Sequence, residues 1–169
     1  SNYIQNTISP QASNFNVSGA GTANVLNATS HFSLNNIQVL KNGGSPDNMF
    51  VGYQAGNTNS TGTGNAFFGT YAGSLNASGL NNSYFGYRSG DFNVGSGNTL
   101  IGALNTSSVS GFTTTNSTSL GYSAFLGNGL SNATAIGYRS FAAASNTIVL
   151  GSINGVIGAT ADTNVGIGI

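Results

Sequence analysis

A short phrase recurs along the chain, in which two or three strand-forming residues end on a glycine. The copies read NMFVG, NAFFG, NSYFG, NTLIG, STSLG, ATAIG, TIVLG and NVGIG. Their glycines, called anchors below, are Gly52, Gly69, Gly86, Gly102, Gly121, Gly137, Gly151 and Gly168. Successive anchors are 14–19 residues apart. Units this short cannot bury a core alone, so they must stack into a solenoid.

The length of the repeat selects the kind of solenoid. Helical repeats need about 33 residues or more, whereas these coils leave room only for short strands and turns. The pattern therefore predicts an all-β fold, a parallel β-solenoid of eight repeats over residues 48–169, with coils about 4.8 Å apart. We expect each anchor to adopt a positive φ or to permit a close backbone approach.

Residues 1–47 lack the repeat. They alternate between polar and apolar residues, which is typical of short β-strands, and Asn35–Asn36 is a candidate turn. We expect this segment to form an N-terminal cap or a connector to something upstream. The opening SNYIQNT has no secretory signal, so we expect either that a signal has been removed or that the chain is a fragment.

In the first four repeats, both residues before the anchor are apolar, as in Phe67 and Phe68. Adjacent strand residues face opposite sides of a sheet, so one of these faces fills the inside of the coil. The other face needs a cover from outside. Because nothing else in the chain is large enough, the pattern predicts a homo-oligomer.

Asparagine occurs in two registers relative to the anchor. Asn48, Asn65, Asn82 and Asn98 come four residues before it, whereas Asn116, Asn132 and Asn146 come five residues before it. Stacked Asn side chains can hydrogen-bond along a solenoid. We interpret the change of register, near residues 105–116, as a local loop and a change of cross-section within one domain.

The composition excludes several classes of partner. Only 4% of the residues are charged, the formal net charge is zero, and there is no cysteine. Nucleic-acid binding calls for a basic surface, which this chain lacks. A polybasic membrane contact is excluded for the same reason, and no stretch approaches the roughly 18 apolar residues of a membrane span. We expect no cofactor, no nucleic acid and no direct membrane insertion by this segment.

The later repeats, NSTSLGYSA, NATAIGYRS and NTIVLG, resemble the head repeats of trimeric autotransporter adhesins, the YadA-like heads. The earlier repeats, NMFVGYQAG, NAFFGTYAG and NSYFGYRSG, are similar to repeats of bacterial and phage tail-fibre-like surface proteins, and TNVGIG to the end of such fibres. The resemblance implies a left-handed parallel β-roll that assembles as a homotrimer. It also implies an extracellular or cell-surface, non-catalytic role. The spacing is longer and the aromatic residues are bulkier than in the head repeats.

Few residues could carry catalysis. Glycoside hydrolysis usually needs two carboxyl groups about 5–10 Å apart. Asp47, Asp91 and Asp162 are all the carboxylates of the chain, and we expect them in separate outer turns that point into water. His31 is the sole imidazole and lies in the non-repeating segment, where a packed or solvent-facing histidine is more common than a metal ligand. The sequence predicts no enzyme, no catalytic residues and no metal site.

The candidate contact residues are Tyr87, Arg88, Tyr138 and Arg139, from two copies of GYRS. Tyrosine rings beside arginines could meet an acidic glycan or a host protein, or the rings could only pack along the stack. The leading hypothesis is a structural and interaction protein, a trimeric segment of an extracellular fibre or adhesin. The alternatives are a phage or injection-device tail-fibre shaft, a polysaccharide-acting β-solenoid enzyme, and an ice-binding solenoid with a threonine row, hinted at by residues 113–115.

Overall fold

The computed structural model describes residues 31–35, 37–43, 45, 47–105 and 111–163. These residues form strands and turns, and none of them is helical. The strands are β1 (His31–Leu34), β2 (Ile37–Lys41), β3 (Met49–Val51), β4 (Ala66–Phe68), β5 (Ser83–Phe85), β6 (Thr99–Ile101), β7 (Thr118–Leu120), β8 (Phe125–Leu126), β9 (Thr134–Ile136), β10 (Phe141–Ala142) and β11 (Ile148–Leu150).

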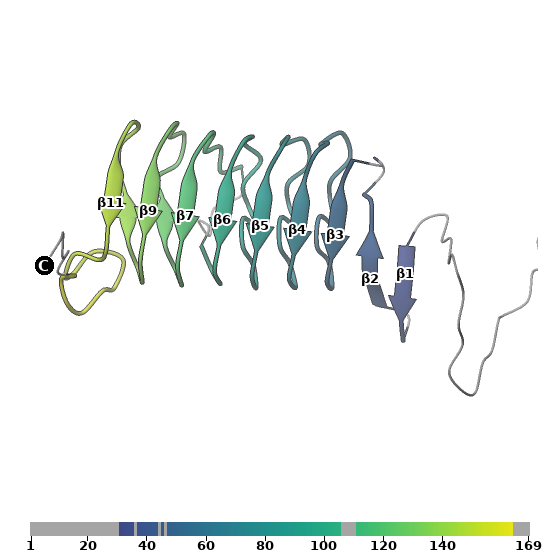
Figure 1. Ribbon diagram of the computed structural model, residues 1–169, viewed down its shortest axis with the longest axis horizontal. Coiled ribbons are helices and arrows are strands. Elements are labelled where there is room, and N and C mark those ends of the chain that lie inside the picture. The colour runs from purple at the N-terminus through teal and green to yellow at the C-terminus, as the bar shows by residue number, and fades with distance from the viewer. Residues whose placement is uncertain (1–30, 36, 44, 46, 106–110, 164–169) are drawn as a thin grey trace, which may run out of the picture.

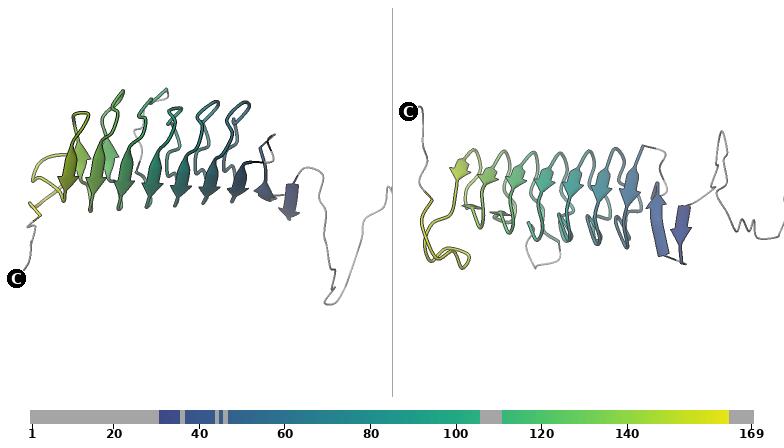
Figure 2. Two further views of the ribbon diagram at one scale, coloured as in Figure 1. Left: turned by 45° about the horizontal axis from the view of Figure 1, so that its top comes forward. Right: turned by 60° about the horizontal axis from the view of Figure 1, so that its bottom comes forward.

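The main sheet has nine strands in the order β1-β2-β3-β4-β5-β6-β7-β9-β11. From β3 onward every neighbouring pair is parallel, and the coils stack along the long axis of the molecule (Figure 1). Each coil passes once through this sheet and returns on the other side (Figure 2). The predicted all-β parallel solenoid is confirmed, with about six turns over the described residues. The predicted eighth anchor, Gly168, lies outside them.

The register of the sheet follows the anchors. Phe50 pairs with Phe67, Phe67 with Tyr84, and the same position continues through Leu100, Ser119, Ala135 and Val149. The seven described anchors, Gly52 to Gly151, have φ values between 86° and 138°. A Cβ on Gly69 would lie 2.5 Å from the carbonyl oxygen of Gly86 in the next coil. Both expectations for the anchors, a positive φ and a close backbone approach, are therefore confirmed for these residues.

The interior of the first coils is a column of aromatic rings. Phe50, Phe67 and Tyr84 are buried and stack face to face, with centroids 4.8 Å apart and planes within 8° of parallel. Gly73 lies against the ring of Phe67, where a Cβ would be 2.5 Å from a ring carbon. This spacing equals the rise of a coil, so each ring contacts the rings of both neighbouring coils.

The interior changes after β6. The strand residues that face inward become small, Ser119 and Ala135, and Leu126 of β8 enters the core instead. β8 and β10 pair in parallel as a second, two-stranded sheet. The main sheet continues unbroken from β6 to β7. The cross-section changes near the expected place, and residues 106–110 of the expected loop lie outside the described residues.

Asparagine side chains form a hydrogen-bonded ladder along the early coils. The Oδ1 of Asn65 accepts a hydrogen bond from the backbone N–H of Asn82 at 2.9 Å, and Asn82 does the same for Asn98. The Nδ2 of Asn82 donates to the carbonyl of Gly95 at 2.9 Å. Ser117 continues the ladder by accepting from the N–H of Ala133. The predicted Asn ladder is confirmed for this register.

The second asparagine register has a different cause. Asn116, Asn132 and Asn146 have φ values of 49°, 54° and 59°, and the same position in earlier coils holds Gly64, Asn81 and Gly97, also with positive φ. Glycine and asparagine are the residues that adopt this left-handed conformation most readily. The two registers therefore reflect two adjacent positions, one selected for side-chain hydrogen bonding and one for backbone conformation.

An antiparallel hairpin precedes the first coil. β1 pairs with β2, Asn35 in the turn has a φ of 49°, and β2 pairs antiparallel with β3 at the end of the main sheet. The Nζ of Lys41 lies 5.9 Å from the ring centroid of Phe50, over the end of the aromatic column. The hairpin therefore supplies hydrogen-bonding partners to an edge strand that would otherwise be open. The side chain of His31 lies outside the described part of the chain.

The hydroxyl of Tyr84 is a polar group in this column. It is fully buried near the amides of Asn76, Asn93 and Asn98, yet it completes no hydrogen bond with a described residue. A buried unpaired hydroxyl costs about 1–3 kcal/mol. We expect Tyr84→Phe to raise the free energy of unfolding by about 1 kcal/mol, measured by urea denaturation. A loss of stability would instead show that the hydroxyl is hydrogen-bonded.

The same residue predicts sensitivity to alkali. Burial raises the pKa of Tyr84 above its usual value of 10. The unfolded chain then releases this proton near pH 10 while the folded chain keeps it, so stability falls as pH rises above 10, by about 1.4 kcal/mol per pH unit. Burial lowers the pKa of Lys41, whose effect on stability has the opposite sign but ends near pH 10.5, the usual pKa of a lysine. Comparison with Tyr84→Phe isolates the contribution of Tyr84, because the variant should lose this additional slope.

Candidate functional site

The outward face of the main sheet carries a continuous row of apolar side chains. The row, called the outer stripe, consists of Val51, Phe68, Phe85, Ile101, Leu120, Ile136 and Leu150. From Phe85 onward these residues are 36–48% exposed, and Phe68 stacks on Phe85 with centroids 4.9 Å apart. Their neighbours one position earlier in each strand are buried, from Phe50 to Ala135. Of the two apolar residues that precede each early anchor, the first therefore fills the core and the second lies on the outward face of the sheet.

Two further rows flank the outer stripe. Thr99, Thr118 and Thr134 lie in register two residues before it in β6, β7 and β9. Tyr53, Tyr87, Tyr122 and Tyr138 follow the anchors and are 43–55% exposed. The rings of Tyr122 and Tyr138 stack at 5.9 Å. The outward side of the sheet therefore offers methyl, hydroxyl and aromatic groups and no charged side chain in these rows.

Arg88 and Arg139 occupy the same position in their coils, with φ values of 53° and 51°. The Nε of Arg88 donates to Oδ2 of Asp91 at 2.8 Å. This hydrogen bond, followed by the charge of the carboxylate, raises the pKa of Arg88. The Asp91 side chain is only 5% exposed, so the expectation that every aspartate points into water is wrong for this residue. Its burial follows from the compensating charge of Arg88.

The second arginine has different partners. The guanidinium of Arg139 donates to the carbonyl of Gly158 and lies 5.3 Å from the ring centroid of Tyr138. The residue three positions after Arg139 is Ala142, whereas Asp91 stands three positions after Arg88. The two GYRS copies therefore have unlike surroundings, and both arginine side chains fold back onto the protein.

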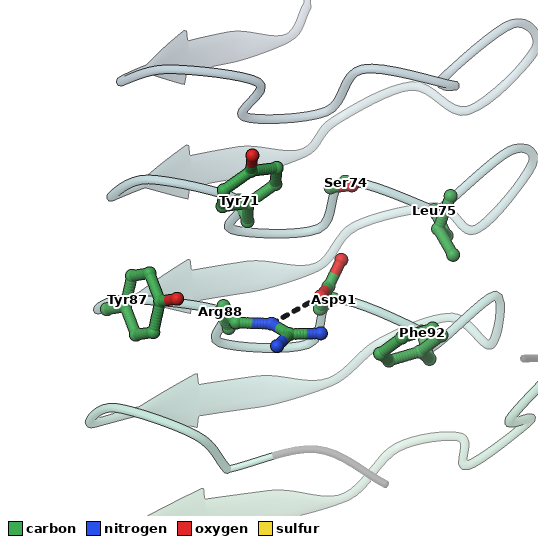
Figure 3. Close-up of a pocket in the computed structure, with 7 residues that line it drawn as sticks. All are labelled: Tyr71, Ser74, Leu75, Tyr87, Arg88, Asp91 and Phe92. Carbon is green, nitrogen blue, oxygen red and sulfur yellow. Dashed lines mark hydrogen bonds and ion pairs between the residues drawn. The ribbon is translucent and has the colours of Figure 1, made fainter. Parts of the chain in front are cut away.

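A pocket of about 400 Å³ opens beside Arg88, on the turns that follow β4 and β5 (Figure 3). It is lined by Tyr71, Ser74, Leu75, Tyr87, Arg88, Asp91 and Phe92. The guanidinium of Arg88 lies 5.7 Å from the ring centroid of Phe92. Two of the predicted contact residues, Tyr87 and Arg88, thus line one pocket. Tyr138 and Arg139 lie three coils away and do not line it.

Sequence reasoning missed the other walls of this pocket. Tyr71 comes two residues after its anchor and Phe92 six residues after the next anchor, so the two line one pocket only when coils are stacked. A usable signal was present, because aligning the coils on their anchors places an arginine and an aspartate together in one coil alone, the one with Gly86.

The remaining ionisable groups are dispersed. Asp47 is exposed before β3, and Asp162, after β11, accepts a hydrogen bond from the backbone N–H of Asn154 at 2.8 Å. Within the described ranges, no three His, Cys, Asp or Glu side chains gather as a metal site would require. A search of the same residues finds no helix long and apolar enough to cross a membrane. The surface of the described residues includes an apolar face and an aromatic pocket with an ion pair.

Compared with protein-family models, with curated proteins and with solved structures, the chain matches none.

Proposed function

We propose that this chain is a structural and interaction protein, a homotrimeric segment of an extracellular or cell-surface fibre. Each protomer is a left-handed β-roll, and the outer stripes of three protomers meet along the fibre. The observation that carries the proposal is the outer stripe itself, an apolar row that runs across seven strands with nothing in the described chain to cover it.

The energetics favour a cover by other copies. Burying a Leu, Ile or Phe side chain fully contributes about 1.5–3 kcal/mol, so covering five half-exposed residues contributes about 5 kcal/mol per chain. A second copy matches the row because its coils have the same rise of about 4.8 Å, so apolar positions repeat in step. The outer stripe contains no charged side chain, so its burial carries no cost of desolvating a charge.

The coil geometry suits a mechanical role. The coils hydrogen-bond to their neighbours through the sheet and the return segments, as in the bond from Leu75 N–H to the carbonyl of Asp91 at 2.8 Å, and the early coils also through the Asn ladder. Such a rod resists bending, while its outer turns tolerate varied residues for recognition. A phage or injection-device tail-fibre shaft would use the same rod. The neighbouring genes would distinguish such a shaft from a cell-surface fibre.

One observation favours a second candidate, an ice-binding solenoid. Thr99, Thr118 and Thr134 form an in-register row beside Ile101, Leu120 and Ile136 on the same face. A regular array of hydroxyl and methyl groups on an uncharged face can order water. This candidate needs the face free, whereas the fibre needs it covered, so thermal hysteresis by a monomeric chain would favour ice binding.

The outer stripe is tested by a charge placed in its centre. We expect Leu120→Asp to dissociate the trimer into monomers, because three carboxylates would be desolvated at the interface. Leu80→Asp is the matched control, since Leu80 is 42% exposed against 44% for Leu120 and lies outside the stripe. Size-exclusion chromatography with light scattering reads the mass of each variant.

The two variants separate an interface from a merely exposed surface. The proposal predicts a trimer for the unmodified chain and for Leu80→Asp, and a folded monomer or an unfolded chain for Leu120→Asp. A trimer that survives Leu120→Asp would show that the outer stripe is not the interface.

A further inference from the structure

We infer that the pocket beside Arg88 binds a neutral sugar unit of a surface polysaccharide or glycoprotein glycan. This deepens the recognition part of the proposed function and rests on it for the setting in which the sugar is met. The pocket itself belongs to a single protomer, because all its walls come from two neighbouring coils of one chain.

The polar groups of the pocket form one neutral pair. Arg88 and Asp91 are joined at 2.8 Å, and their side chains are 38% and 5% exposed. The two charges cancel, so the pocket has no net attraction for an acidic group, and the carboxylate repels one. The pair still offers N–H donors beside a carboxylate acceptor. Neighbouring hydroxyls of a sugar both donate and accept, which matches such a pair.

The apolar walls stand on both sides of this pair (Figure 3). Tyr71 and Tyr87 lie to one side of Arg88 and Asp91, and Leu75 and Phe92 to the other. Aromatic rings offer flat apolar faces, and a pyranose ring presents a face of C–H groups that can lie against them. A volume of about 400 Å³ falls at the small end of ligand pockets. The pocket thus has room for a sugar residue rather than a folded partner.

The pocket is specific to one place in the repeat. In the other described coils, the position equivalent to Arg88 holds Gln54, Tyr71, Leu104, Ser123, Arg139 and Ile153. In the coil of Arg139 the positions equivalent to Asp91 and Phe92 are Ala142 and Ala143. The coil of Arg139 therefore lacks this combination of ion pair and aromatic walls. The coils do not need it in order to stack.

The neutral sugar expected here differs from the acidic glycan that the sequence predicts. Two exposed arginines predicted an acidic glycan, but Arg88 is neutralised by Asp91 and the Arg139 guanidinium is hydrogen-bonded to Gly158. The structure instead favours an uncharged hexose or N-acetylhexosamine in one pocket per chain.

The test uses saturation-transfer NMR on the full chain. The probes are the methyl glycosides of glucose, galactose, mannose and N-acetylglucosamine, with N-acetylneuraminic acid as the acidic probe. We expect transfer to at least one neutral glycoside and a dissociation constant about fivefold to tenfold higher in Tyr87→Ser, because a stacking wall is lost. Tyr122→Ser is the matched control, since Tyr122 is 49% exposed against 50% for Tyr87 and is remote from the pocket.

A second variant tests the ion pair. Asp91→Asn removes the acceptor charge and leaves Arg88 unneutralised, so we expect weaker binding of the neutral glycoside and stronger binding of N-acetylneuraminic acid. Absence of transfer to every neutral probe, transfer unchanged in Tyr87→Ser, or a preference of the unmodified chain for the acidic probe would overturn the inference. The mass of the unmodified chain is measured separately, so a failed trimer and a failed sugar site are distinguishable.

Discussion

Replacing Phe67 by Ala is expected to lower the free energy of unfolding by about 3–5 kcal/mol per chain. Phe67 is fully buried, and its ring lies between those of Phe50 and Tyr84 at 4.8 Å on each side. Truncation would remove both ring contacts and leave a cavity. The two neighbouring coils cannot close it, because they are held at a fixed distance by the hydrogen bonds of the sheet. Chemical denaturation followed by circular dichroism measures the change. A loss below about 1 kcal/mol would contradict the buried column.

The adjacent residue gives an internal comparison. Phe68 faces outward in the same strand, where the single chain leaves it half-buried against Phe85. On an uncovered face, Phe68→Ala should lower stability by only about 1 kcal/mol, the contribution of one ring pair. Under the cover of another protomer it should approach the effect of Phe67→Ala. Equal losses at the two positions support the trimer, and a small loss at Phe68 contradicts it.

Replacing Asn82 by Ala is expected to lower the free energy of unfolding by about 3–5 kcal/mol, since several buried groups lose partners worth about 1–3 kcal/mol each. The Asn82 amide donates to the carbonyl of Gly95, and its oxygen accepts from the N–H of Asn98 and from the Nδ2 of Asn98. None of these groups can reach water, because Asn82 and Asn98 are buried. Thermal and urea denaturation measure the loss.

Asn81 provides the matched control for the ladder. It precedes Asn82, is exposed, and has a φ of 56°, and the same position holds Gly64 and Gly97 in the neighbouring coils. Asn81→Gly should therefore change the free energy of unfolding by less than about 0.5 kcal/mol. Equal effects of Asn82→Ala and Asn81→Gly would mean that the ladder of buried amides does not stabilise the coils.

Much of the fold was predictable because the repeat is a physical constraint on every coil. An anchor such as Gly69 has backbone from the next coil where a Cβ would stand, so the anchor fixes the register of the sheet. The buried position four residues before it needs an amide, which explains Asn65 and Asn82. These requirements act within one coil and its neighbour, so they leave a regular trace in the sequence.

The inward face was harder to predict in the early coils. Phe67 and Phe68 are identical residues on opposite sides of one strand, so hydrophobicity alone cannot say which is inside. The structure relates the choice to Gly73, which has no Cβ and lies against the Phe67 ring. A glycine four residues after the anchor also follows β3 and β5, so this pattern could have identified the face.

The candidate site was only partly predictable. Tyr87 and Arg88 drew attention as a repeated motif, yet the pocket depends on Asp91 and on contacts between successive turns. Arg88 and Arg139 have nearly the same φ, 53° and 51°, so the direction of the Arg88 side chain depends on its partner Asp91 rather than on the shared motif. A motif copied at Arg139 does not copy this environment, because the carboxylate is missing there.

The assembly of the unmodified chain tests the central claim most directly. Sedimentation equilibrium at micromolar concentration gives the mass in solution without assuming a shape. The account predicts a single species with three times the chain mass of 16.9 kDa. A species of 16.9 kDa at every concentration, with the outer stripe open to water, would contradict it.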